Sequence, residues 1–170
     1  MFISNKAKIL SKFVSKNAFI FGPSEIGENT IVDSNVIIGY PSRGSLKEAL
    51  SSAREYYELL ENASKGSKIG SNCHIRSGTI IYENVKIGNN VQTGHNVLIR
   101  EFTEVGNNVI IGTLSVIEGR VKIGNNVRIE SGAFIPINSE IGDNVFIGPY
   151  VVITNDRYPL SKKLVGATIE

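Results

Sequence analysis

The chain has 170 residues, the size of a single domain, and 41% of them are hydrophobic. Its formal net charge is only +2 and it has no dense basic run, so nucleic acid is not an expected partner. No stretch is long and apolar enough for a transmembrane span, and the first residues lack the apolar run of a signal peptide. We therefore expect a cytoplasmic protein without membrane contact.

The first part of the chain introduces a six-residue repeat. Residues 1–13 show no clear pattern and are expected to cap the first coil of a repeat protein. From residue 14 an aliphatic residue recurs at every sixth position, and small or β-branched residues tend to follow four places later. We therefore predict the first coils over residues 14–39. The aliphatic positions are Val14, Ile20, Ile26, Val32 and Ile38.

The repeat is interrupted over residues 40–68, after which the hexads resume out of register with the earlier ones. Within the gap, Ser45 and Glu48 have the spacing of a capping box, and apolar residues follow at intervals of three and four. The sequence predicts one helix over about residues 46–62, inserted at a corner of the solenoid. Such a helix either lines a binding face or packs against the repeats or a neighbouring subunit.

Residues 69–158 form the longest regular run. Fourteen of the fifteen positions spaced six apart in this run hold isoleucine or valine, and the exception is Thr93. A pair of Ile or Val with Gly, and an asparagine after it, also recur at every third hexad, so three hexads form one unit. No helix or single strand has a period of six, whereas hexapeptide repeats indicate a parallel β-helix. We predict five regular coils here.

Each position of the repeat has a physical role. Large aliphatic residues fill the core, β-branched residues suit short extended segments, and asparagine tolerates the left-handed backbone of a corner. Three hexads make three flat faces, so the predicted fold is an all-β triangular solenoid of 18-residue coils with one helical insertion. The coils stack at the strand spacing of ~4.8 Å. Residues 159–170 are expected to form a loop and the start of a further coil within one domain, residues 1–170.

These repeats resemble those of the hexapeptide-repeat acyltransferases, in which an aliphatic residue is often followed by glycine and, four places on, by a small residue. The resemblance implies a left-handed parallel β-helix and a homotrimer. Residues 93–101 (TGHNVLIRE), 153–159 (ITNDRYP) and 75–92 are similar to the sugar-nucleotide N-acetyltransferases of this family. The implied substrates are acetyl-CoA, as the acyl donor, and an amino sugar linked to a nucleotide.

The repeat is broken next to a histidine. Thr93 is the polar residue in the aliphatic series, and Gly94 and His95 follow it. Local rules tend to fail at functional sites, and imidazole titrates near neutral pH, so His95 is the candidate base for the attacking amine. Glu101 holds the same position on the next face, where it could orient His95 or bind the amine as an ammonium group. His74 has no broken neighbour and is interpreted as a surface residue.

The resemblance also implies substrate-binding roles. Asn155 and Asp156 would position the sugar, and Tyr158 would shape the loop that carries them. Backbone amides near Gly94 and Gly112 would contact the acyl donor, because the oxyanion that forms during acyl transfer needs an N–H donor.

The spacing of these residues favours a site shared between subunits. Glu101 and Asn155 are separated by three whole coils, which places them roughly 14 Å apart on one face. That separation is too long for direct contact. A trimer would bring His95 of one subunit near the loop of another, as the family resemblance implies.

Other functions compete with this one. O-acetyl transfer to a sugar or serine on the same fold is the first alternative. A non-catalytic oligomerising scaffold is the second, because the chain ends in mid-coil where related acyltransferases continue. A zinc enzyme resembling the β-helical carbonic anhydrases would need three histidine ligands, and the chain has two histidines, so we expect no metal site. Cys73 falls on an inward position and is expected in the core.

Overall fold

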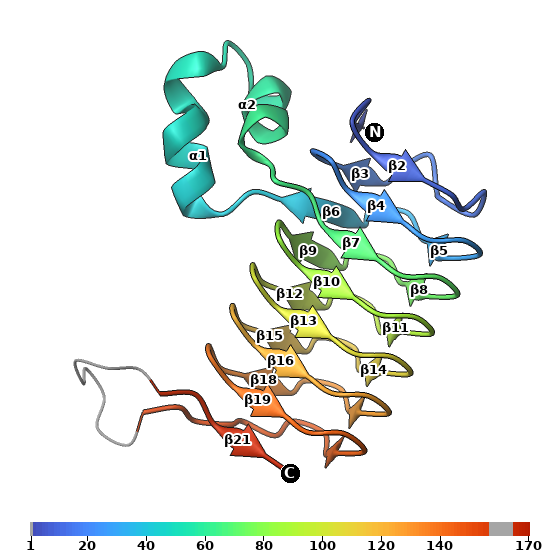
Figure 1. The fold of residues 1–170 in the computed structure, drawn as a ribbon, viewed down its shortest axis with the longest axis vertical. Coiled ribbons are helices and arrows are strands. Elements are labelled where there is room, and N and C mark those ends of the chain that lie inside the picture. The colour runs from blue at the N-terminus through green and yellow to red at the C-terminus, as the bar shows by residue number, and fades with distance from the viewer. Residues whose placement is uncertain (1, 157–164) are drawn as a thin grey trace.

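The structure is a computed structural model that describes residues 2–156 and 165–170. Its strands form three parallel sheets, called A, B and C, which are the faces of a triangular prism (Figure 1). Sheet A contains β1 (Phe2–Ile3), β3 (Phe19–Ile20), β6 (Ile37–Tyr40), β9 (Ile80–Tyr82), β12 (Leu98–Ile99), β15 (Val116–Ile117) and β18 (Phe134–Ile135). Sheet B contains β2 (Lys8–Ile9), β4 (Glu25–Ile26), β7 (Lys68–Ile69), β10 (Lys86–Ile87), β13 (Glu104–Val105), β16 (Lys122–Ile123), β19 (Glu140–Ile141) and β21 (Thr168–Ile169). Sheet C contains β5 (Ile31–Val32), β8 (His74–Ile75), β11 (Gln92–Thr93), β14 (Ile110–Ile111), β17 (Arg128–Ile129) and β20 (Phe146–Ile147).

The chain visits the sheets in the order A, B, C, and each turn adds one parallel strand to each face. In the regular region Ile87 pairs with Val105, and Val105 pairs with Ile123, so each residue meets its counterpart three hexads further along. The predicted coil of three hexads is therefore confirmed. Because the side chains of a strand alternate in direction, the second residue of each short strand points into the prism and the first points out.

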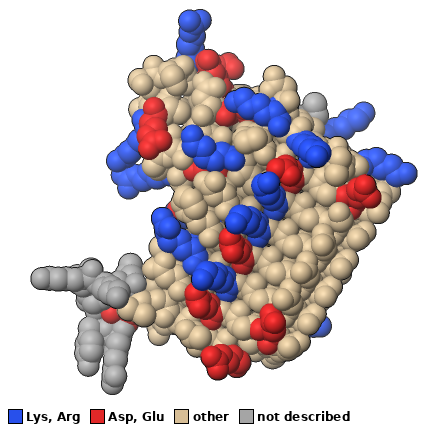
Figure 2. All heavy atoms as spheres, viewed as in Figure 1, with Lys and Arg blue, Asp and Glu red and all other residues tan. Residues whose placement is uncertain are grey.

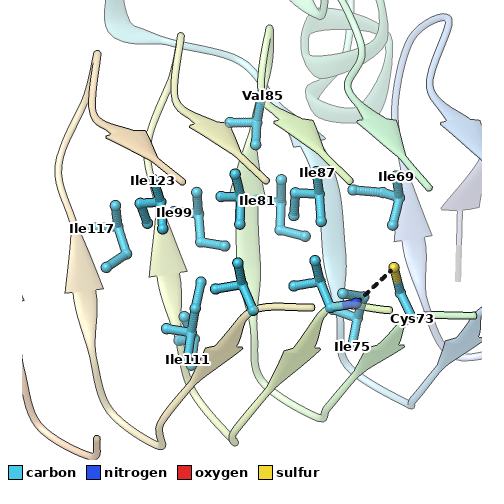
Figure 3. Close-up of a cluster of buried hydrophobic side chains, with 14 of the residues drawn as sticks. Ile69, Cys73, Ile75, Ile81, Val85, Ile87, Ile99, Ile111, Ile117 and Ile123 are labelled. Carbon is cyan, nitrogen blue, oxygen red and sulfur yellow. Dashed lines mark hydrogen bonds between the residues drawn. The ribbon is translucent and has the colours of Figure 1, made fainter. Parts of the chain in front are cut away.

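The core is the column of aliphatic side chains inside the prism (Figure 3). Ile75, Ile81 and Ile99 are fully buried, and the small second series packs beside them. Cys73 lies in this core as expected, and burial raises the pKa of its thiol. The thiol accepts a hydrogen bond from the Val91 N–H at 3.4 Å, so the cysteine is part of the coil-to-coil contacts.

The outward side chains differ sharply between two of the faces. On sheet B nearly all of them are charged, with both signs present, and Figure 2 shows a column of blue and red residues. Lys86 pairs with Glu104 at 2.7 Å and Lys122 with Glu140 at 2.8 Å. On sheet A the outward residues are all apolar. They are Phe2, Phe19, Ile37, Ile80, Leu98, Val116 and Phe134. Sheet B therefore suits contact with water, and sheet A does not.

The solenoid begins earlier than the sequence predicts. A cap without repeats is expected over residues 1–13, but β1 pairs with β3 and β2 pairs with β4, so the first coil starts at Phe2. The reason is a coil that is one residue short. Phe2 pairs with Phe19, whereas the regular spacing would pair it with the following residue, and this offset hides the period in the sequence.

The insertion also differs from the single predicted helix over residues 46–62. It contains α1 (Arg43–Ala49), a 3₁₀ turn (Leu50–Ser52) and α2 (Tyr56–Ala63). Helix α1 starts earlier because Ser42, not Ser45, is the N-cap and its hydroxyl accepts from the Ser45 N–H at 3.3 Å. The helix breaks because the Ser52 hydroxyl bonds back to the Ala49 carbonyl at 2.8 Å and Ala53 turns extended.

One buried carboxylate holds both ends of the insertion. Glu83 is only 1% exposed, and it accepts hydrogen bonds from the Ser42 N–H and the Lys65 N–H, each at 2.9 Å. Further out, the Tyr57 ring of α2 stacks on Phe2 and Phe19, with centroids 5.7 and 6.3 Å apart. The insertion therefore covers the N-terminal end of sheet A and leaves the rest of that face open.

The C-terminal residues add one further strand to sheet B, because β21 pairs with β19. Residues 157–164 fall outside the described part of the chain. Within the described residues, no helix is long and apolar enough to cross a bilayer.

Candidate functional site

The three corners of the prism are named by the sheets that they join, and the BC corner is the regular one. Asn72, Asn90, Asn108 and Asn126 all adopt positive φ there, and a glycine directly follows each preceding strand. The side chains also form a ladder, in which the amide of Asn90 donates to Asn108 and that of Asn108 to Asn126, each at 3.1 Å. The asparagines of this corner therefore have a structural role, because their side chains join successive coils.

The AB corner is built differently. At the positions where the BC corner has glycine, it carries Tyr82, Arg100 and Glu118 on successive coils. The Arg100 guanidinium lies 5.3 Å from the centre of the Tyr82 ring and donates to Glu118 at 3.3 Å. The ring of Tyr40 meets Tyr82 edge-on at 5.1 Å, and burial raises the pKa of Tyr40. The corner beneath the insertion is therefore lined by aromatic and charged groups.

Glu101 lies in this cluster and is held by its neighbour. Arg100 donates from Nε to Oε2 at 3.1 Å and from Nη2 to Oε1 at 2.9 Å, so the pair is bidentate. These hydrogen bonds raise the pKa of Arg100 above the usual guanidinium value, and partial burial opposes that shift. The structure thus presents Glu101 as a fixed carboxylate that faces a cation, and it does not contact His95.

The next position of the AB corner carries large side chains on a left-handed backbone. Phe102 has φ of 62° and Arg120 has φ of 60°, whereas Asn84 and Asn138 occupy the equivalent positions of other coils. A bulky residue in this region is strained, and such strain tends to collect at functional sites. The Phe102 ring is nonetheless exposed, and the Arg120 guanidinium lies 4.7 Å from its centre.

A pocket of about 360 Å³ lies between this corner and the exit from the insertion. Its lining includes Lys65 and Asn84 from the coils nearest the insertion, and Phe102 and Glu104 from the coil below. Phe102 directly follows the Arg100–Glu101 pair in the chain, and neither residue of the pair lines the pocket.

His95 lies at the other edge of sheet A, on the CA corner. Its side chain is exposed, and no described residue forms a hydrogen bond or ion pair with the imidazole. Its backbone N–H donates to the Thr113 hydroxyl at 3.1 Å, which fixes the corner itself. His74, in contrast, is paired with Asp33 at 3.2 Å on the outer surface of sheet C.

The broken repeat position beside His95 has a structural explanation. Thr93 is fully buried, and its hydroxyl accepts from the Arg76 N–H at 2.9 Å in place of the usual backbone carbonyl. The freed Thr93 carbonyl accepts from Nη1 of Arg76 at 2.6 Å. The threonine therefore alters the ladder between β8 and β11, and it does not face the surface where His95 lies.

The two glycines proposed for the acyl donor lie on the CA corner as well. The N–H of Gly94 donates to the Ile111 carbonyl at 2.6 Å, and that of Gly112 to the Ile129 carbonyl at 2.7 Å. Both amides are therefore already used between coils. A side chain at Gly94 would overlap the Thr113 backbone, which explains glycine there by close packing. Donor binding by amides near these residues stays a prediction.

The other predicted site residues lie at the C-terminal end of the AB corner. Asn155 is in the same corner column as Glu101, three coils further along, and its amide lies 3.5 Å from the Ile137 carbonyl. Asp156 follows it and is partly buried. Tyr158 falls outside the described residues. Within one chain, the structure therefore groups Glu101 and Asn155 along one edge of sheet A and leaves His95 on the opposite edge.

Sequence reasoning missed the AB corner cluster of Tyr82, Arg100, Phe102, Glu118 and Arg120. A signal was present, because these residues replace the glycine and asparagine that mark the BC corner from Gly27 onward. Reading each corner column from coil to coil, instead of searching each hexad for an exception, would have found them. Among the described residues, no group of three potential metal ligands comes together.

Comparison with known proteins agrees with the repeat and the fold. Residues 66–101 and 102–136 match the family model "Bacterial transferase hexapeptide (six repeats)". Among solved structures, the UDP-N-acetylglucosamine acyltransferase of Bacteroides fragilis 9343 is 21% identical with a TM-score of 0.70, covering 91% of this chain and 66% of that chain. The enzyme of the same name from Campylobacter jejuni is 21% identical with a TM-score of 0.74, covering 91% of this chain and 58% of that chain.

The fold prediction is confirmed by these findings. The chain is a left-handed parallel β-helix built from hexapeptide repeats. It spans less than two thirds of the length of the two structures that it resembles. No curated protein matches the sequence of this chain significantly.

Proposed function

We propose that this chain of bacterial-transferase hexapeptide repeats is an acyltransferase for a nucleotide-linked sugar, and more specifically an acetyl-CoA-dependent N-acetyltransferase for an amino sugar. The observation that carries the proposal is the polar cluster of the AB corner, where the bidentate Arg100–Glu101 pair directly precedes Phe102, a residue that lines a pocket. Two proteins of the same fold are named as acyltransferases of UDP-N-acetylglucosamine, which supports the substrate class.

The reaction requires one new bond and one broken bond. The sugar amine attacks the thioester carbonyl, a C–N bond forms, the C–S bond breaks and the thiolate leaves. The amine must lose a proton, which His95 accepts because its imidazole is exposed and histidine is the most common general base in enzymes. Glu101, held by Arg100, attracts the amine as ammonium and orients it before the proton is removed.

The site is completed by a second copy of the chain. His95 and Glu101 lie at opposite edges of sheet A, on consecutive hexads of nearly equal height. If three prisms turn sheet A toward a common axis, the CA corner of each copy meets the AB corner of the next, and His95 faces Glu101 of a second copy. Such a head-to-tail arrangement closes into a ring, here a homotrimer. The apolar outward column of sheet A supports this interface, because water is a poor environment for it.

The remaining residues have supporting roles in this proposal. Asn155 and Asp156, with Tyr158 in the loop, position the sugar from the far end of the AB corner. Backbone groups near Gly94 and Gly112 contact the acetyl-CoA thioester. These roles are carried by sequence resemblance, and the structure supports them only by placing Asn155 and Glu101 in one column.

The test is a release assay for CoA thiol, with purified protein, acetyl-CoA and a panel of UDP- and dTDP-linked amino sugars. We expect turnover with an amine acceptor, and a fall in kcat of about 10²–10⁴-fold in His95→Ala with donor binding unchanged. His74→Ala is the matched control, since His74 is paired with Asp33 on sheet C and should keep wild-type activity.

Three outcomes would contradict the proposal in different ways. Acceptance of only hydroxyl acceptors would replace it by O-acetyl transfer. Turnover with a longer acyl donor but not with acetyl-CoA would correct the donor. A trimer that binds no acyl donor and releases no thiol would identify a scaffold.

A further inference from the structure

The pocket at the AB corner contains three lysines. Lys65, Lys68 and Lys86 line it with one carboxylate, Glu104. Lys65 has no ion-pair partner among the described residues, whereas Lys68 pairs with Glu25 at 2.8 Å and Lys86 with Glu104 at 2.7 Å. Exposed ion pairs of this kind contribute little to folding stability. Lys68 and Lys86 can therefore exchange their carboxylate partners for a ligand with several negative charges. The lining therefore favours an anion over a neutral sugar.

An aromatic ring lies at the same pocket. Phe102 lines it with a ring that is 46% exposed. Its backbone is left-handed, at φ of 62°, in a position where Asn84 and Asn138 stand on other coils. Asparagine would fit this backbone with less strain, so the phenylalanine supplies an aromatic ring to the pocket at some cost in backbone energy. Arg120 comes from the following coil and places its guanidinium 4.7 Å from the ring centre.

We infer that this pocket binds a nucleoside diphosphate group, with the base stacked on Phe102 and the phosphates on Lys65, Lys68 and Lys86. Aromatic side chains stack on nucleic acid bases, and lysine ammonium groups are common phosphate ligands. The pocket volume of about 360 Å³ lies within the usual range for small-molecule sites, roughly 300–1,000 Å³.

Two substrates of the proposed reaction contain this chemistry. A UDP-linked sugar presents a pyrimidine and a diphosphate, and CoA presents an adenosine that carries a phosphate and a diphosphate. The inference rests on the proposed function only for this choice of ligands. Its test needs no turnover, because binding of UDP and of 3′,5′-ADP can be measured on the full chain without an acceptor or a thioester.

The experiment is calorimetric titration with UDP, 3′,5′-ADP and inorganic pyrophosphate. We expect Phe102→Asn to weaken binding of the preferred nucleotide by about tenfold and to leave pyrophosphate binding unchanged, since only the base stacks on the ring. Asparagine already occupies the equivalent turn in neighbouring coils, so this variant should fold, which its melting temperature would verify. Lys65→Gln should weaken all three ligands and reduce the dependence of binding on salt.

Lys122→Gln is the matched control, because Lys122 is also an exposed lysine, lies on sheet B, pairs with Glu140 and stands outside the pocket. Tighter binding of UDP than of 3′,5′-ADP would assign the pocket to the nucleotide sugar, and the reverse order to CoA. The inference is overturned if neither nucleotide binds at millimolar concentration, or if Phe102→Asn and Lys65→Gln bind them as tightly as Lys122→Gln does.

The two proposals fail separately. If acyl transfer occurs but Phe102→Asn leaves the KM of both substrates unchanged, the pocket assignment is wrong and the proposed function stands. If nucleotide binding depends on Phe102 but no transfer is found with any acceptor, the pocket stands and the proposed function is wrong.

Discussion

The guanidinium of Arg100 donates two hydrogen bonds to the carboxylate of Glu101, at 3.1 Å from Nε and 2.9 Å from Nη2. The two residues are adjacent in sequence. Both lie in the AB corner between β12 and β13, where the backbone turns and lets their side chains face each other. Arg100 also donates to Glu118 on the following coil at 3.3 Å. One arginine therefore fixes the carboxylate that we assign to the acceptor amine.

Replacing Arg100 by lysine should disturb activity more than stability. Lysine keeps the charge but cannot donate in bidentate geometry, so Glu101 would lose its fixed orientation. We expect kcat/KM to fall by about ten- to a hundredfold, because small misplacements of a positioning group are costly. Arg128→Lys is the control, since Arg128 pairs with Glu130 on sheet C and should tolerate the change. Equal kinetics of the two variants would contradict this role.

Sheet A should be the face through which copies associate. Leu98 is the outward residue of β12, and Leu98→Lys would place a charge in the centre of the apolar column. We expect this variant to become monomeric in analytical ultracentrifugation and to lose activity with the shared site. Ile110→Lys tests the same change in the same coil on sheet C, where Ile110 is 38% exposed, and it should stay oligomeric. Dissociation by Ile110→Lys alone would assign the interface to sheet C.

Some bulky corner residues should lower the stability of the single chain. Leu114 is 57% exposed and has φ of 61° on the CA corner. In the monomeric Leu98→Lys background, Leu114→Asn should increase the free energy of unfolding by about 1 kcal/mol, because asparagine tolerates this backbone. Asn108→Leu makes the opposite change in the asparagine ladder and should decrease it by a similar or larger amount, measured by urea denaturation. A loss of stability in Leu114→Asn would show that the leucine contributes to packing.

The attachment of the helical insertion should depend on Glu83. Removing its carboxylate leaves the partly buried N–H groups of Ser42 and Lys65 without their acceptor. We expect Glu83→Ala to lower the free energy of unfolding by about 2–4 kcal/mol, since each unsatisfied group costs about 1–3 kcal/mol. Limited proteolysis should then cut the insertion faster than in the wild type. Glu48→Ala, an exposed change in the same insertion, should leave both measurements unaltered.

Cys73 should be unreactive in the folded protein. Its side chain is buried, and burial raises the pKa of the thiol, so the reactive thiolate is scarce at neutral pH. A raised pKa keeps the thiol protonated, so modification of Cys73 should become easier only as pH rises. We expect a thiol-specific chromophoric reagent at pH 8 to label native protein roughly a hundredfold or more slowly than protein unfolded in urea. Equal rates would mean that this part of the core opens readily.

The core of this protein can be predicted from the sequence, residue by residue. The hexad assigns Ile75, Ile81 and Ile99 to the interior because each of its positions has one fixed direction, and the structure buries all three. The prediction fails where a coil departs from 18 residues or where a local hydrogen bond ends a helix early. A first coil that is one residue short conceals β1, and Ser52 splits the insertion into two helices.

The candidate site is predicted only in part. His95 stands out because it follows a broken repeat position, yet that position, Thr93, serves the ladder between coils. Glu101 is identified by its place in the hexad, but its partner Arg100 is not. A corner side chain such as Arg100 contacts residues of the neighbouring coils, and the sequence of a single hexad does not predict those contacts.

The solenoid follows from the sequence alone. An aliphatic residue at every sixth position can be buried in no other regular structure, and asparagine and glycine mark the corners. Only the tertiary structure decided which corner carries the chemistry. Stacking the coils brings Tyr82, Arg100 and Glu118 into one column, and folding the insertion back onto Glu83 places Lys65 beside Phe102. Those contacts join residues that are distant along the chain, so they arise from the packing of coils and not from the local preference of any one segment.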